Sequence, residues 1–164
     1  MSRYITVSAA LLAAALLSTA QAAPLMERNI NSEDAMVAYE RMMSSCGPNL
    51  NNVTVVFVDR AGQVVLQARA NGANPHNFEL SRRKAYTART FRSPSADFIA
   101  KSAPDKDLAG QRMLKDVIPL GGGIPIMIGE DAIGAVGISG AKGGQPREEV
   151  CARAGIAAIQ GQLS

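Results

Sequence analysis

The residues best suited to chemistry gather in one segment, residues 72–91, which reads GANPHNFELSRRKAYTARTF. It contains His76, the only histidine of the chain. Five bases run through and just past its end with no acid between them: Arg82, Arg83, Lys84, Arg89 and Arg92. A neutral imidazole can ligate a metal ion, and guanidinium groups match the geometry of carboxylates. The simpler interpretation is a solvated histidine in a polar turn and a solvated charged helix face.

A helix must position these side chains. Asn74 is a candidate N-cap and Pro75 suits the first helical position, which puts His76 in the first turn. On a helical wheel Lys84 falls on the packing face, among small residues that include Ser81. A buried, unpaired ammonium is costly, so Lys84 is expected to snorkel, to pair with a carboxylate or to meet a ligand. The structural alternative is an ion pair, for which Asp59 is the candidate partner.

The remaining pattern predicts an α+β fold. Ser32 is a candidate N-cap for a first helix, and short helical pieces flank Pro104. A last helix closes the chain. Alternating apolar residues predict two hairpins, Val53–Val58 with Gln63–Ala70 and Ile124–Ile128 with Ala132–Ser139. Hairpins imply a central antiparallel sheet with helices packed on it.

Glycines mark further features. Gly134 and Gly137 inside a predicted strand indicate the close approach of a backbone or a ligand. The loops PLGGGIP and SGAKGGQP are compatible with anion binding by free N–H groups or with loop geometry alone.

The N-terminus is typical of a secretory signal peptide. Arg3 precedes an uncharged apolar run, and small residues end in Ala20-Gln21-Ala22. Residues 1–22 are therefore expected to be removed, leaving residues 23–164 as a single periplasmic or secreted domain. The apolar run is too short to span a bilayer, so no membrane insertion is expected.

The two cysteines, Cys46 and Cys151, would then meet an oxidising compartment. Their even number and that compartment favour a disulfide, and two buried free thiols are the alternative. Two cysteines and one histidine, well separated in sequence, do not make a metal-ligand cluster.

The amino-acid composition argues against some classes of binding partner. The formal net charge is only +3 and there is no tryptophan, so the chain lacks the basic surface and stacking platforms of nucleic-acid binders. A small molecule or another protein is the expected partner. No Ser/His/Asp or Cys/His constellation can be assembled, so any catalysis would depend mainly on a bound cofactor.

Several motifs together resemble one family. In chain order they are VFVDRAGQVV, RRKAYTA, GGGIPIMI, IGAVGISG and EEVCARAGIAAI. They are similar to the GlcG/HbpS family of haem-binding proteins, which is related to the C-terminal domain of PduO-type proteins. The resemblance implies a profilin-like α/β/α sandwich and assembly into homo-oligomers. It also implies a haem or related tetrapyrrole ligand, and family members include haem-degrading proteins.

The resemblance gives the segment at 72–91 a hypothetical role. His76 is the candidate axial ligand of haem iron, and Lys84, within the motif Lys84-Ala85-Tyr86-Thr87-Ala88, and Arg83 are candidate cofactor-binding residues. Two other functions stay open. The chain is compatible with an accessory or enzymatic factor that binds small organic acids such as glycolate, or with a structural partner module that has no ligand.

Overall fold

The computed structural model describes residues 23–46 and 50–163, and the predicted signal peptide lies outside them. Five helical segments and four strands follow one another along this part of the chain. Their bounds are α1 Ser32–Cys46, β1 Thr54–Asp59, β2 Val64–Arg69, α2 Asn77–Phe91, α3 Asp97–Lys101, the 3₁₀ helix η2 Ala109–Met113, β3 Gly123–Ile128, β4 Asp131–Ser139 and α4 Gly144–Ile159.

The four strands form one antiparallel sheet with the order β2-β1-β4-β3. Each hairpin pairs consecutive strands, and the pairing of β1 with β4 joins the hairpins, with Thr54 opposite Ser139. The two predicted hairpins are therefore confirmed, and their ends agree with the sequence-based bounds to within one residue.

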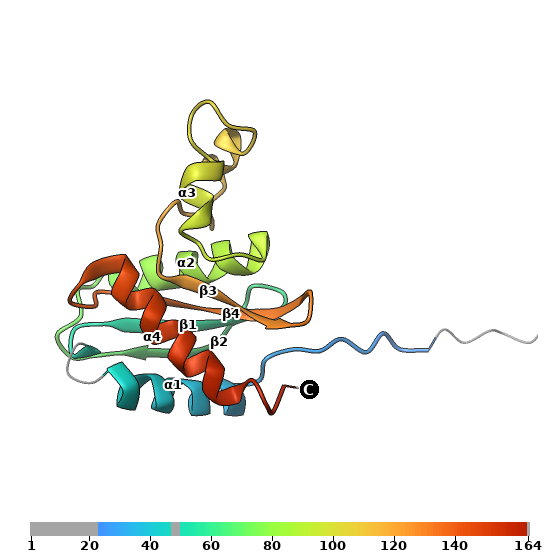
Figure 1. Cartoon of the computed structure of the whole chain (residues 1–164), viewed down its shortest axis with the longest axis vertical. Helices are drawn as coiled ribbons and strands as arrows, with labels where there is room; N and C mark the ends of the chain where they lie inside the picture. The colour runs from blue at the N-terminus through green and yellow to red at the C-terminus, as the bar shows by residue number, and fades with distance from the viewer. Residues whose placement is uncertain (1–22, 47–49, 164) are drawn as a thin grey trace, which may run out of the picture.

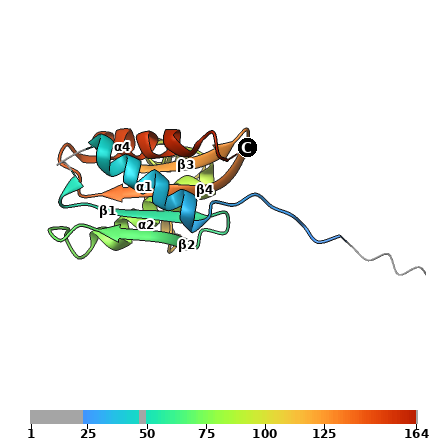
Figure 2. The same ribbon diagram turned by 90° about the horizontal axis from the view of Figure 1, so that it is seen from below.

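Helices cover both faces of this sheet. Helices α1 and α4 lie side by side on one face, and α2 lies on the other (Figures 1 and 2). Alternate residues of β1 divide between the two layers, as the strand pleat requires. Val55 and Phe57 join the large core beneath α1 and α4, whereas Val56 and Val58 pack with alanines of α2. This is the α/β/α sandwich that the family resemblance implied.

Two glycines of β4 permit close packing, as their place in a strand indicated. A Cβ built on Gly137 would collide with the carbonyl oxygen of Ser81 in α2. A Cβ on Gly134 would lie 2.6 Å from the carbonyl oxygen of Val58 and 2.5 Å from a methyl group of Ile30. Backbone and neighbouring side chains therefore occupy the space that side chains at these positions would need.

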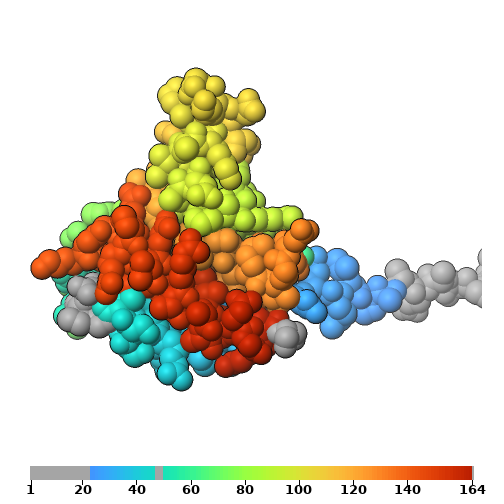
Figure 3. Space-filling model, in the orientation of Figure 1, coloured from blue at the N-terminus to red at the C-terminus, as the bar shows by residue number. Residues whose placement is uncertain are grey.

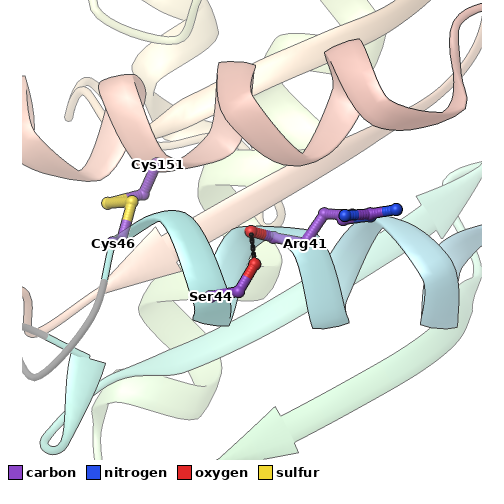
Figure 4. Close-up of a disulfide and its surroundings, with 4 residues drawn as sticks. All are labelled: Arg41, Ser44, Cys46 and Cys151. Atoms are coloured by element: carbon purple, nitrogen blue, oxygen red, sulfur yellow. Dashed lines mark hydrogen bonds between the residues drawn. A yellow bond between two sulfur atoms is a disulfide. The ribbon is translucent and has the colours of Figure 1, made fainter.

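A disulfide joins the two helices of one layer. Cys46 at the end of α1 and Cys151 in α4 have Cα atoms 5.7 Å apart and bonded sulfur atoms (Figure 4). The predicted pairing is confirmed. In the same last turns of α1, the Ser44 hydroxyl donates a hydrogen bond of 2.9 Å to the Arg41 carbonyl oxygen.

Residues 92–120, called the arm below, project from the sandwich and include α3 and η2 (Figures 1 and 3). Within it, Phe98 is buried against Phe91 of α2, with ring centroids 4.4 Å apart. Side chains of α2 also hold the base of the arm. These contacts are Arg82 to Asp116 at 2.6 Å, Arg83 to the Val117 carbonyl at 2.5 Å and the Ile118 N–H to the Thr87 hydroxyl at 2.8 Å.

Two predicted helix starts are wrong. The side chain of Asn31, not Ser32, caps α1, because its Oδ1 accepts the N–H of Asp34 at 2.8 Å. Helix α2 begins at Asn77, because the N–H of Asn77 closes a turn onto the Asn74 carbonyl at 3.0 Å before the helix starts. In both cases the backbone turn lies one or two residues from the position that residue preference favours.

Candidate functional site

A buried ion pair joins α2, which carries most of the candidate residues, to α4. Lys84 Nζ lies 2.7 Å from Glu148 Oε2, and the two side chains are only 4% and 5% exposed. Lys84 also donates to the Ile138 carbonyl at 3.0 Å. Glu148 Oε1 accepts the N–H of Gly140 at 2.9 Å. Both charges are therefore satisfied inside the protein, as buried charges must be.

The predicted ion-pair partner of Lys84 is wrong. Asp59 stands at the turn between β1 and β2, where its Oδ1 accepts the N–H of Gln63 at 2.8 Å. Sequence reasoning missed Glu148, although a signal was present. Cys151, Ala152 and Gly155 follow it at three, four and seven residues, and this spacing places Glu148 on the buried face of α4.

The glycine-rich loop before β3 closes over this ion pair. A Cβ on Gly122 would lie 2.5 Å from Glu148 Oε2 and 3.1 Å from Lys84 Nζ, and its φ of +107° also favours glycine. The neighbouring N–H groups have side-chain acceptors. Gly121 donates to Gln145 at 2.7 Å, and Gly123 donates to Ser95 at 2.8 Å.

The N–H groups of the loop after β4 also have a side-chain acceptor. The N–H groups of Gly140 and Ala141 both point to Glu148 Oε1. The donors of the two glycine-rich loops thus bind α4 and the arm, which favours the loop-geometry interpretation over an anion cradle.

His76 lies at the exposed end of α2. Its backbone is helical, with φ −73° and ψ −15°, and its carbonyl accepts the N–H of Leu80 at 3.1 Å. The imidazole makes no hydrogen bond or ion pair with any residue of the described part of the chain. Both ring nitrogens therefore remain available to an external ligand.

Two residues of α2, Leu80 and Arg83, lie on the same side of the helix as the His76 imidazole. Leu80 is one turn and Arg83 two turns beyond His76, at spacings of four and seven residues. Leu80 is half-buried, and Arg83 keeps an Nε without a partner while one Nη holds the Val117 carbonyl. We call His76, Leu80 and Arg83 the α2 stripe. It offers a metal ligand, an apolar contact and a cation in a row about 10 Å long.

The other predicted bases have different surroundings. Arg82 lies 2.9 Å from a carboxylate oxygen of Glu79 and 2.6 Å from one of Asp116. The hydrogen bond that Arg82 donates to Glu79 lowers the pKa of Glu79. Arg89 and Arg92 lie at the far end of α2, about 20 Å from His76 along the helix. The stripe therefore contains Arg83 alone of the four arginines.

No helix in the described part of the chain is long and apolar enough to cross a membrane. Within the same residues, no group of three or more histidine, cysteine or acidic side chains is placed to hold a metal ion.

The described residues thus form the α/β/α sandwich that is expected of the family that the motifs resemble. The family model described as "Haem degrading protein HbpS-like" matches residues 30–157, so the chain belongs to the HbpS-like family.

A curated protein is similar in sequence to part of the chain. A Citrobacter freundii protein, described as an uncharacterized 15.0 kDa protein of the dhaT-dhaS intergenic region, is 34% identical over 93 residues. The match covers 54% of this chain and 66% of that protein, so the chain spans slightly less than two thirds of its curated relative.

Solved structures share the fold. Klebsiella pneumoniae ORFY has a TM-score of 0.76 at 22% identity, covering 85% of this chain and 97% of its own. HbpS has a TM-score of 0.74 at 25% identity, covering 83% and 94%. PduOC, solved in complex with heme, has a TM-score of 0.71 at 24% identity, covering 80% and 95%.

Proposed function

We propose that this chain is an extracytoplasmic haem-binding protein that uses His76 as an axial ligand of the iron. The observation that carries the proposal is the free, exposed imidazole of His76 on a chain of the HbpS-like family. The heme complex of the structural relative PduOC supports the same ligand class.

The α2 stripe fits such a ligand. The imidazole can ligate iron, Leu80 offers an apolar contact for the macrocycle, and the half-buried guanidinium group of Arg83 offers a positive charge to a propionate. When bound, haem supplies the iron chemistry. The residues of this chain bind it and set its orientation.

Lys84 has a positioning role in this proposal. Its ammonium is 4% exposed and engaged by Glu148, so it does not reach a ligand beside His76. The ion pair instead fixes α2, which carries the stripe, against the loops at the end of the sheet.

The proposed location rests on two features. Residues 1–22 have the pattern of a signal peptide, and the Cys46–Cys151 disulfide is typical of proteins that fold in oxidising compartments.

We further propose a homo-oligomer. The arm exposes Met113 by 88%, Leu114 by 51% and Ile99 by 40%, and apolar side chains gathered on a projecting element favour a protein interface. Light scattering of the protein and of a Met113→Lys variant tests this, with a smaller particle expected for the variant.

A hemin titration followed in the Soret region tests haem binding. We use residues 23–164 without a histidine tag, and compare wild type with His76→Ala, Arg83→Gln and the exposed-site control Arg153→Gln. Saturable binding by wild type and control, weakened at least tenfold in His76→Ala, supports the proposal. Equal binding by His76→Ala removes this residue from the site. Repeating the titration with a reductant and oxygen separates binding from degradation.

A further inference from the structure

A cavity lies at the opposite end of α2 from His76. It is open to solvent and has a volume of about 270 Å³ between α2 and the turn that joins β1 to β2. Its lining consists of Arg60, Ala61, Gly62, Tyr86, Arg89 and Thr90. A space of this size suits a small molecule and not a tetrapyrrole.

The cavity contains a guanidinium without an internal counter-ion. Arg89 makes no ion pair with any described residue, and its Nε is buried without a hydrogen-bond partner. A buried donor left without an acceptor is unfavourable, so this group is suited to an incoming acceptor.

The neighbouring charges favour an anion. Arg60 is paired with Asp131, at 2.6 Å and 2.8 Å, and lies 3.5 Å from Glu27. Arg92, in a left-handed conformation at the end of α2, has no ion pair among the described residues. Burial and the positive charges of Arg60 and Arg92 lower the pKa of Arg89, against weaker contributions from Asp131 and Asp59. Arg89 and Arg92 thus make no direct ion pair with a described residue.

The cavity wall is fixed by close packing. A Cβ on Gly62 would lie 2.7 Å from the Tyr86 ring, and Gly62 has φ +78°, so only glycine fits here without strain. The Tyr86 ring therefore rests directly on the β1–β2 turn, beside Arg89 one turn further along α2.

We propose that this cavity, called the Arg89 cavity, binds a small dianionic oxyanion such as a dicarboxylate or a phosphate. Guanidinium groups bind both classes through paired N–H donors. Arg89 provides the buried donor, Arg92 the second positive charge and Tyr86 the wall of the site. The site is independent of haem binding, because it lies at the other end of α2.

Tyrosine fluorescence gives a local probe. The chain has no tryptophan, and beyond residue 22 its tyrosines are Tyr39 and Tyr86, so a Tyr39→Phe protein reports on Tyr86 alone. Malonate, inorganic phosphate and acetate are titrated at constant ionic strength. We compare this protein with versions that also carry Arg89→Gln or the control Arg153→Gln, whose arginine is exposed on α4.

The proposal is supported if malonate or phosphate changes the Tyr86 fluorescence saturably and binds more tightly than acetate. Arg89→Gln should weaken this binding at least tenfold, and Arg153→Gln should not. The response to malonate against phosphate decides between a carboxylate and a phosphate ligand. Absence of saturable binding by both dianions, or equal affinity in Arg89→Gln, overturns it. Hemin titration of Arg89→Gln serves as a fold control, and unchanged hemin binding is expected because the two sites are separate.

Discussion

Replacing Lys84 with methionine tests the buried ion pair that fixes α2. The change leaves the Glu148 carboxylate, which is 5% exposed, without its counter-ion. Removing one partner of a buried pair costs about 3–5 kcal/mol of the free energy of unfolding. For a domain of this size, about 3 °C per kcal/mol corresponds to a fall in Tm of about 10 °C or more.

A double-mutant cycle isolates the interaction. Glu148→Leu alone leaves the Lys84 ammonium buried and removes the acceptor of the Gly140 and Ala141 N–H groups, so it is also destabilising. In the double variant Lys84→Met/Glu148→Leu no buried charge remains. We expect its loss in free energy of unfolding to be smaller than the sum of the two single losses by at least about 1 kcal/mol.

Urea denaturation of the oxidised protein measures these energies, with the exposed-site variant Lys101→Met as control for loss of a lysine. The control is expected to change stability by less than about 0.5 kcal/mol. Single changes that add within about 0.5 kcal/mol, or a cost below about 1 kcal/mol for Lys84→Met, would refute the assignment of this pair as a structural anchor.

Three further predictions concern the frame of the site. Replacing Cys46 and Cys151 with serine opens a link across 105 residues and should lower the free energy of unfolding by about 4–5 kcal/mol in the chain-entropy model, as measured by urea denaturation. Gly137→Ala should cost about 1–3 kcal/mol or more in the same assay, because the added Cβ collides with α2. The pKa of Glu79 is lowered by Arg82, so the folded state gains stability from this carboxylate above about pH 4.5 and loses it as the pH falls through the folded pKa. Glu79→Gln should therefore flatten the acid limb of the stability curve below about pH 4.5.

Each of these has a contradicting result. Equal stability of the oxidised and reduced wild-type protein would show that the disulfide does not stabilise the fold. For the glycine, Gly110→Ala is the control, since no atom lies within 4 Å of its built Cβ, and equal effects at both positions would contradict close packing at Gly137. An acid limb unchanged in Glu79→Gln would show that its contact with Arg82 does not contribute to stability.

Local patterns were sufficient for the strands and the disulfide. The hairpins follow from alternation over a few residues, and the pairing of Cys46 with Cys151 follows from compartment and number. The family motifs then supplied the layers. Helix starts were less predictable, because Asn31 and Ser32 are both good caps and only the backbone turn selects between them.

The partners of charged side chains could not be read from sequence in the same way. Lys84 contacts Glu148, 64 residues away in sequence, because the loop after β4 places the start of α4 beside Lys84 of α2. The run of bases was compatible with carboxylate binding or with a solvated helix face. In the structure Arg82 and Arg83 hold the arm and Arg89 lines a separate cavity, which only the tertiary contacts reveal.

The most direct test of the central proposal uses the fact that His76 is the only histidine of the chain. Protein from residue 23 onward, without a tag, is labelled with ¹⁵N-histidine, loaded with hemin and studied by resonance Raman spectroscopy. Because one residue carries the label, an isotope shift of the iron–nitrogen stretching band identifies the ligand without a mutation. We predict such a shift. A haem complex that forms with full affinity and shows no shift in its iron–ligand bands would contradict axial ligation by His76.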